Sequence, residues 1–151
     1  MDEVKNLDIL VAPTGGGGLL SGTALAASIF CPAISVYGAE PDAVNDAFRS
    51  FHSGKIEVNP PNAFTIADGL RTSLGDLTFA CIRKHVKQIL TVKEEEIVSV
   101  MKNIWQNLKI TAEPSSAVAL AAVLKNRELF SGKRVGIIVS GGNVDLEALP
   151  F

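Results

Sequence analysis

The segment LDILVAPTGGGGLLSG, residues 7–22, decides how the rest of the chain is interpreted. Its first six residues, LDILVA, form a short apolar run of the kind that buried parallel strands show. Four glycines follow, and the stretch Leu19–Ile29, rich in Ala and Leu, is typical of a helix. A strand that passes through a glycine loop into a helix gathers main-chain N–H groups at a helix N-terminus. Such an arrangement binds an anion such as phosphate.

The alternation of strand-like runs and helical stretches continues along the chain. Strands are expected at 7–12, 34–39, 88–92 and 134–139, and helices at 19–29, 42–52, 77–87 and 114–125. Thr91 and Glu94 have the spacing of a capping box, which predicts a further helix that ends near Leu108. Pro114 suits the first turn of the last helix. The pattern predicts an α/β fold over residues 1–151, a single domain with an open, mostly parallel twisted sheet and helices on both faces.

The composition excludes several classes of protein. With 47% hydrophobic residues, the chain is too apolar for an intrinsically disordered protein. Its 14 basic and 16 acidic residues give a net charge of -2, so no positive field holds a nucleic acid or an anionic membrane. No apolar run approaches the ~20 residues that span a bilayer, and the first ten residues lack the pattern of a secretion signal. We therefore expect a cytoplasmic protein with no nucleic-acid or membrane partner.

The glycine loop leaves three interpretations open from the residues alone. A Walker loop needs Lys and then Ser or Thr after the last glycine, where this chain has two leucines. A dinucleotide-binding loop fits better, because Gly16 and Gly18 match its first two glycines and Ser21 replaces the third. Glu40 ends the next strand, where a ribose-binding acid would lie. The third interpretation is a tight turn that binds no ligand.

A second glycine turn follows the last predicted strand, with the sequence Ser140–Gly141–Gly142–Asn143. Ligands of open parallel sheets bind outside the carboxyl ends of the strands. We therefore expect both glycine turns at one edge of the sheet, with a single pocket between them. Ser140 would offer that pocket a hydroxyl group.

Five segments of the chain occur in the order found in a known family. They are VAPTGGGGLLSG, YGAEPDAVNDA, TIADGLRTSLGDLT, TAEPSSAVALAAVL and VSGGNVDL. Together they resemble the carboxyl-terminal portion of the serine racemases and threonine (serine) dehydratases, pyridoxal-phosphate enzymes of the tryptophan-synthase-β fold type. The resemblance covers essentially all 151 residues. It displaces the dinucleotide interpretation, because dinucleotide folds do not carry the paired ADGLRTS and SGGNVDL segments.

The resemblance implies a set of residues for pyridoxal 5'-phosphate and its substrate. The cofactor residues would be Gly15, Gly16, Gly17, Gly18, Leu19, Glu113, Ser140 and Gly141. The four glycines and Leu19 would hold the phosphate through main-chain N–H groups. Ser140 would hydrogen-bond the pyridine nitrogen, and Glu113 would approach the ring. Gly69 and Thr72 would lie along the substrate side of the pocket.

The resemblance also implies a site for a divalent cation. Glu40 and Asp46 match its carboxylates, and the main-chain carbonyl of Val44 lies between them in the sequence. Three oxygen ligands suit a hard cation such as Mg²⁺ or Ca²⁺. The alternative for the two acids is the start of a helix, where the helix dipole favours negative charge.

The resembled enzymes hold their cofactor as a Schiff base with a lysine in a Ser/Asn–Phe–Lys–x–Arg–Gly motif. No lysine of this chain lies in that context. The family places that lysine, and a serine on the opposite face of the cofactor, upstream of the glycine loop. We therefore expect the fold to be incomplete relative to the family, without the small domain and the lysine segment, and the isolated chain to be inactive.

The function expected from the resemblance is that of a serine racemase or an L-serine (L-threonine) dehydratase. Such an enzyme removes the Cα proton of a hydroxy-amino acid and then racemises it or eliminates the β-hydroxyl group. The whole protein would act on a small-molecule amino acid as a homodimer, and this chain would supply the cofactor-phosphate portion. A truncated, non-catalytic isoform that binds a full-length partner is the alternative. A Rossmann-type NAD-binding protein is the second alternative.

Overall fold

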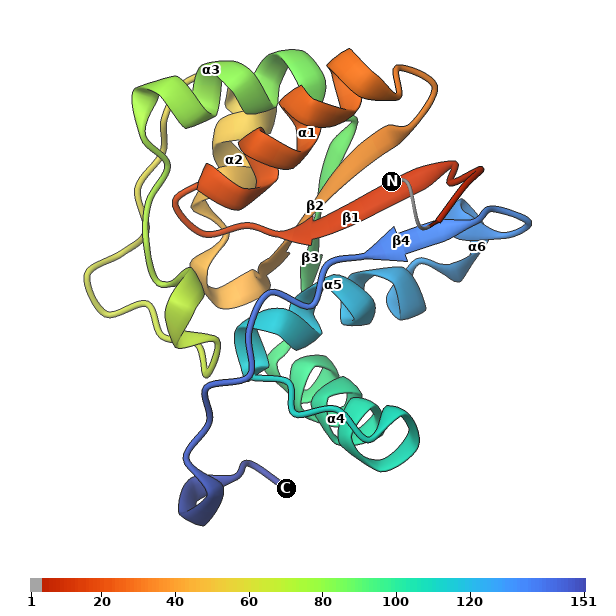
Figure 1. The fold of residues 1–151 in the computed structure, drawn as a ribbon. Helices are drawn as coiled ribbons and strands as arrows, with labels where there is room; N and C mark the ends of the chain where they lie inside the picture. The colour runs from red at the N-terminus through yellow and green to blue at the C-terminus, as the bar shows by residue number, and fades with distance from the viewer. Residues whose placement is uncertain (1–3) are drawn as a thin grey trace.

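The structure, a computed structural model, describes residues 4–151, so the first three residues of the predicted domain lie outside it. Four parallel strands form one sheet in the order β3-β2-β1-β4 (Figure 1). The strands are β1 (Ile9–Pro13), β2 (Ser35–Pro41), β3 (Gln88–Val92) and β4 (Val135–Ile137). The α-helices are α1 (Gly18–Phe30), α2 (Asp46–Ser53), α3 (Asp76–His85), α4 (Glu94–Asn103), α5 (Pro114–Lys125) and α6 (Arg127–Phe130). Across residues 4–151, every helix is too short or too polar to cross a bilayer.

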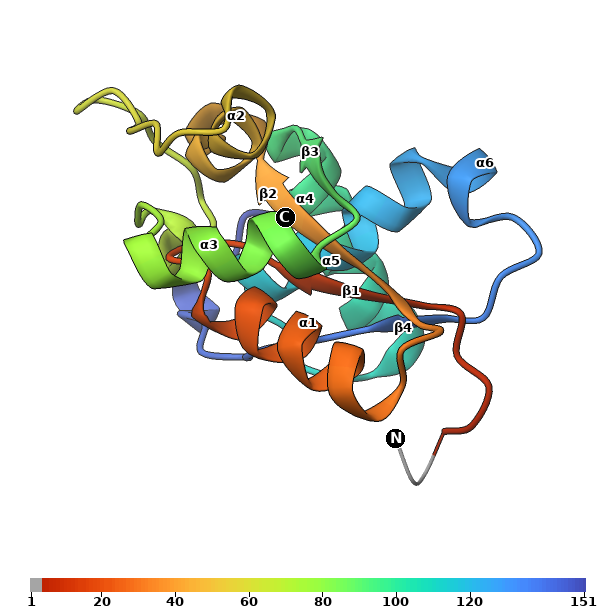
Figure 2. The same ribbon diagram turned by 90° about the horizontal axis from the view of Figure 1, so that it is seen from above.

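Helices cover both faces of the sheet, which confirms the predicted α/β architecture. In Figures 1 and 2, α1, α2 and α3 lie over one face, and α4 and α5 lie under the other. Successive residues of β1 feed the two cores, since Ala12 packs with Leu20 of α1 and Val11 packs with Val118 of α5. This alternation is the period of two that a strand imposes on its side chains.

The predicted capping box is wrong. Thr91 belongs to β3, where it pairs with Glu40 of β2, and α4 begins three residues later at Glu94. Lys93 is the N-cap instead, and its main-chain N–H donates to the Glu96 carboxylate at 2.7 Å. The sheet ladder takes the threonine because β-branched residues fit a strand well.

Two other helices differ in detail from the prediction. The residues expected to form one helix at 42–52 divide into a 3₁₀ turn, Asp42–Val44, and α2. The helix expected to end near Leu108 continues beyond α4 as a wider π-turn, Ile104–Leu108, and stops at Lys109 in the left-handed region. The last predicted helix begins at Pro114, as expected.

The strand order places two chain segments from opposite ends of the sequence side by side. From β1 the chain moves outward to β2 and β3, and it then returns to β4 on the other side of β1. β1 and β4 are parallel neighbours in register, with Val11 opposite Ile137. Their carboxyl ends therefore open at the same edge. This is the switch point at which open α/β sheets bind ligands.

We predict that Gly38 of β2 tolerates no side chain. A Cβ atom there would lie 2.7 Å from both Leu20 Cδ2 and Thr14 Oγ1, beneath α1. Gly38→Ala should lower the free energy of unfolding by about 1–3 kcal/mol through overpacking. Gly22→Ala, on the exposed side of α1 where no atom lies within 4 Å, should raise it by about 0.5–1 kcal/mol. Urea unfolding measures both, and equal effects would contradict the packing described here.

Candidate functional site

A cavity of about 220 Å³ opens at the switch point, where β1 and β4 end. It brings together residues from four separate parts of the chain. Its lining comprises Pro13, Gly15, Gly16, Gly17, Gly18, Leu19, Gly69, Leu70, Glu113, Ser115 and Ser140. The two glycine turns therefore face one cavity, as their places at the ends of neighbouring strands predict.

The glycine loop joins β1 to the N-terminus of α1. Gly17 is the N-cap of α1 and has a φ of 84°, a conformation that favours glycine. The first intrahelical bond joins the N–H of Ser21 to the carbonyl of Gly17 at 2.8 Å. The N–H groups of the preceding residues therefore have no intrahelical acceptor, and the helix dipole adds partial positive charge there. This end of the cavity suits an anion such as phosphate.

The start of α3 supports the glycine loop from behind. A Cβ atom on Gly17 would lie 2.8 Å from Leu74 Cδ2 and 2.9 Å from Thr78 Cβ. The Thr78 hydroxyl also donates to the Gly16 carbonyl at 2.9 Å. The loop is thus fixed by packing as well as by its own turn.

Gly69 and Thr72, the predicted substrate residues, lie against the glycine loop. A Cβ atom on Gly15 would lie 3.0 Å from Thr72 Oγ1 and 3.1 Å from the Gly69 carbonyl oxygen. Gly69 lines the cavity, whereas Thr72 contacts the loop without being part of the lining. Gly15 therefore allows the segment 69–72 to approach the loop closely.

The sequence analysis missed two serines at the start of α5. Ser115 is 2% exposed, and its hydroxyl accepts the N–H of Gly69 at 3.1 Å. Ser116 is fully buried, and its hydroxyl bonds both the N–H and the carbonyl of Gly141 at 2.7 Å. The start of α5 thus fixes the segment 69–72 and the turn after β4. The signal in the sequence was the polar pair that follows Pro114 in an otherwise apolar helix.

Glu113 and Gly141 lie together at the same end of the cavity. The Glu113 carboxylate accepts the N–H of Asn143 at 3.0 Å, and its own N–H donates to the Gly141 carbonyl at 3.1 Å. A Cβ atom on Gly141 would lie only 2.7 Å from Glu113 Oε2. Gly141 lies behind Glu113 and Ser140, which line the cavity, and is not itself part of the lining.

Glu40 and Asp46, the predicted metal ligands, are buried beside α2. The oxygens of Glu40 accept the N–H groups of Ala47 at 3.1 Å and Phe48 at 2.9 Å. Burial raises the pKa of Glu40 to about 8, and repulsion from Asp46 contributes. Burial also raises the pKa of Asp46.

Asp46 is held from two sides. Its carboxylate accepts the Asn59 side-chain amide at 2.6 Å and the N–H of Leu74 at 3.2 Å. The third predicted ligand, Val44, is buried and ends the 3₁₀ turn before α2. In the described part of the chain, neither carboxylate forms an ion pair. No group of three or more His, Cys, Asp or Glu side chains that could hold a metal ion is found within residues 4–151.

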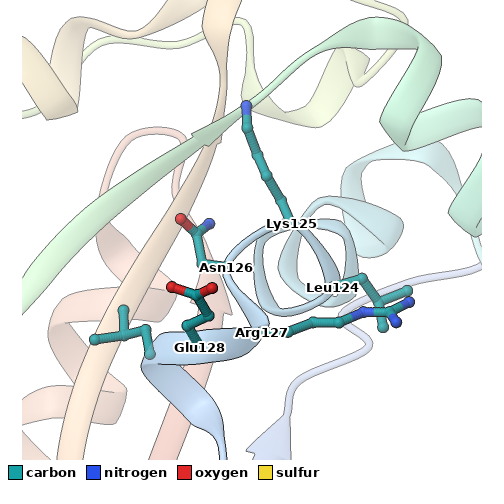
Figure 3. Close-up of a pocket in the computed structure, with 6 residues that line it drawn as sticks. Leu124, Lys125, Asn126, Arg127 and Glu128 are labelled. Carbon is teal, nitrogen blue, oxygen red and sulfur yellow. The ribbon is translucent and has the colours of Figure 1, made fainter.

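A larger hollow, of about 440 Å³, lies at the end of α5 and the start of α6. Residues 124–129 line it, so it is built from one short segment of the chain. Its side chains point in different directions, with Lys125 extending away from Arg127 (Figure 3). Lys125 is already bound to the Thr91 carbonyl at 3.0 Å and to the Glu96 carboxylate at 3.1 Å. We assign the functional site to the smaller cavity, because its polar groups converge from separate elements.

The fold and the smaller cavity together define a phosphate-binding α/β protein of the open parallel type. Residues 1–141 match the family model described as pyridoxal-phosphate dependent enzyme. The chain belongs to this family. The match decides against the dinucleotide interpretation, which assigned Glu40 to a ribose, since both Glu40 oxygens are buried against main-chain N–H groups.

Individual relatives agree with the family match. The chain is 51% identical to the beta-hydroxyaspartate dehydratase of Paracoccus denitrificans over 100% of this chain and 48% of that protein. The crystal structure of serine racemase from Dictyostelium discoideum has a TM-score of 0.89 and 48% identity, over 97% of this chain and 47% of that one. The crystal structure of T.th. threonine deaminase has a TM-score of 0.87 and 40% identity, over 92% and 51%. The chain spans about half the length of the curated relatives that it matches.

Proposed function

We propose that this chain forms the phosphate-binding side of a pyridoxal-phosphate-dependent racemase or dehydratase of hydroxy-amino acids. The observation that supports this most directly is the glycine loop at the N-terminus of α1, which lines a cavity together with Ser140 and Glu113. The names of the relatives support the substrate class, since serine, threonine and 3-hydroxyaspartate all carry a hydroxyl group on Cβ.

The phosphate would bind at the glycine loop. Gly15, Gly16, Gly17, Gly18 and Leu19 would direct main-chain N–H groups at its oxygens. The site is suited to this task because the loop lies at the positive end of α1 and is held in place by α3. These contacts are made by the main chain, so the phosphate needs no Lys or Arg side chain from this part of the chain.

The ring of the cofactor would lie between the glycine loop and the turn after β4. Pyridoxal phosphate, when bound, supplies an electron sink for the bond that breaks at Cα. Ser140 would hydrogen-bond the ring nitrogen, and Gly141 and Glu113 would close that end of the cavity. A neutral hydroxyl partner does not hold the ring nitrogen in its protonated form, as a carboxylate would.

The substrate would approach from the side of Gly69 and Thr72. Both contact the glycine loop or its cavity, so a substrate carboxylate there would meet main-chain groups and the Thr72 hydroxyl. No lysine lines the cavity within residues 4–151. We therefore assign the groups that move the Cα proton to the half of the fold that this chain does not match, and binding and orientation to this chain.

The resemblance supports two further parts of the proposal. It implies that the whole protein is a homodimer and that it works in the cytoplasm on free amino acids. The relatives named for serine, threonine and hydroxyaspartate chemistry all act on small-molecule substrates.

We predict that Gly18→Val weakens binding of pyridoxal 5'-phosphate to the chain by about tenfold or more. Gly18 lines the cavity, so a branched side chain would occupy phosphate space, and a tenfold change corresponds to about 1.4 kcal/mol. Gly22→Val is the matched control, because Gly22 lies one turn further along α1 and is equally open. Fluorescence titration measures both dissociation constants. Equal effects, or no effect at Gly18, would contradict the phosphate site.

The substrate class is tested in a chimaera of Dictyostelium discoideum serine racemase in which this chain replaces the matching section. We expect cofactor-dependent formation of D-serine, keto acid or ammonia from at least one of L-serine, L-threonine and L-threo-3-hydroxyaspartate. Gly18→Val should abolish most of this activity and Gly22→Val should preserve it. A soluble chimaera that retains bound cofactor but converts none of the three substrates would overturn the proposed reaction.

We also propose that Glu40, Asp46 and the Val44 carbonyl bind Mg²⁺ or Ca²⁺. Two neighbouring buried carboxylates without an ion-pair partner in the described part of the chain fit a hard cation, which would compensate their charge. Their oxygen ligands are of the type that such cations prefer.

The chain should therefore be stabilised by millimolar Mg²⁺ or Ca²⁺, by about 2.7 kcal/mol when the ion is at 100 times its dissociation constant. Combining Glu40→Gln with Asp46→Asn should remove the ion-dependent part of the melting temperature. Asp42→Asn, which changes an exposed acid of the same segment, should leave it intact. A melting temperature that ignores both ions in the parent chain would refute the metal site.

A further inference from the structure

Ser116 carries an unusual set of hydrogen bonds for a buried hydroxyl. It is 0% exposed at the start of α5, and it reaches across to the turn after β4. Its Oγ accepts the N–H of Gly141 at 2.7 Å and donates to the carbonyl of the same residue at 2.7 Å. Its Oγ also lies 3.3 Å from Ser140 Oγ, which lines the cavity.

The number of protons on these groups fixes the direction of the bond between the two serines. A serine hydroxyl has one proton and two lone pairs. Ser116 uses its proton on the Gly141 carbonyl and one lone pair on the Gly141 N–H. Only a lone pair remains for Ser140, so Ser140 is the donor of that pair. At 3.3 Å the bond is longer than the 2.7–2.8 Å usual between hydroxyl groups, and its proton is available to a better acceptor in the cavity.

We propose that Ser116 is a positioning residue that makes Ser140 a hydrogen-bond donor toward the ring nitrogen of the cofactor. By binding both polar groups of Gly141, Ser116 fixes the peptide that follows Ser140 and so directs its side chain. By using its only proton elsewhere, it leaves Ser140 no donor to accept from. The ring nitrogen therefore meets a donor, which stabilises its unprotonated form. This inference rests on the proposed function, in which Ser140 faces that nitrogen.

Ser50 provides a matched control for the loss of a buried hydroxyl. It is also 0% exposed and also lies in a helix, α2, away from the cavity. Its hydroxyl accepts the N–H of Glu57 at 2.9 Å and donates to the carbonyl of Asp46 at 2.6 Å. Ser50→Ala and Ser116→Ala thus remove the same pair of hydrogen bonds, and we expect comparable decreases in melting temperature.

The test uses pyridoxine 5'-phosphate labelled with ¹⁵N in the ring, which has no aldehyde and so needs no lysine. The ¹⁵N chemical shift, followed across pH, reports the pKa of the ring nitrogen of the bound ligand. Ser140→Ala and Ser116→Ala should each raise this pKa by about one unit relative to the parent chain. The double variant should raise it no further than Ser140→Ala alone, because Ser116 acts through Ser140. Ser50→Ala should leave it unchanged.

Amide hydrogen exchange gives a second readout that does not depend on the ligand. The Gly141 amide should exchange faster in Ser116→Ala than in the parent chain or in Ser50→Ala, since its acceptor is removed. Should Ser116→Ala fail to fold, Ser116→Cys takes its place, because a thiol is a weak donor and acceptor of similar size.

The possible outcomes separate this inference from the proposed function. If Ser140→Ala shifts the ring pKa and Ser116→Ala does not, the positioning role is wrong and the proposed function stands. If the double variant exceeds Ser140→Ala, Ser116 does not act through Ser140 and the inference is overturned. If the parent chain binds no pyridoxine 5'-phosphate, the proposed function fails and takes the inference with it, whatever the Gly141 exchange rate.

Discussion

The parallel pairing of β4 with β1 is the constraint on which the site depends. It sets Val11 opposite Ile137, so that the glycine loop and the Ser140 turn leave the sheet at the same edge. The two turns are more than 120 residues apart in the sequence, and only this pairing makes them neighbours. The start of α5 then links the edge to the segment 69–72 through Ser115 and to the Ser140 turn through Ser116. The cavity is consequently a product of sheet topology, and its side chains add to a frame made of main chain.

The same frame explains how far the sequence could predict the site. The glycine loop, Gly69, Glu113 and Ser140 lie on short segments whose residue types carry their own signal, and the alternation of strands and helices predicts their common edge. The bonds of Ser115 and Ser116 had no such signal, because they join residues 46 and 25 positions apart. The Thr91 spacing misled because a local helix-capping pattern competed with a strand ladder, and pairing with Glu40 prevailed. Local patterns predict elements well, whereas the contacts between elements depend on packing that one sequence does not display.

The glycines of the loop serve different needs, although the sequence presents them as one run. Gly17 needs its positive φ and the space taken by α3, and Gly15 needs the close approach of Thr72 and the Gly69 carbonyl. Gly18 has no protein atom near its Cβ position, so no packing contact within the described chain accounts for it. Its openness toward the cavity is accounted for by a ligand that comes close to the main chain. This division locates the ligand requirement at the helix end of the loop and the structural requirement at the strand end.

The polarity of the cavity follows from which groups are already bound within the chain. The Glu113 carboxylate is held by the N–H of Asn143, so the acid nearest the ring is engaged in the turn. The hydroxyl of Ser116 is saturated by Gly141, which leaves Ser140 as the polar side chain of that turn with a proton to give. Negative charge from a phosphate would meet the N-terminus of α1, and an aromatic nitrogen would meet a neutral donor. A site of this polarity favours a ligand that is anionic at one end and an uncharged acceptor at the other, which is the chemical character of pyridoxal phosphate with an unprotonated ring.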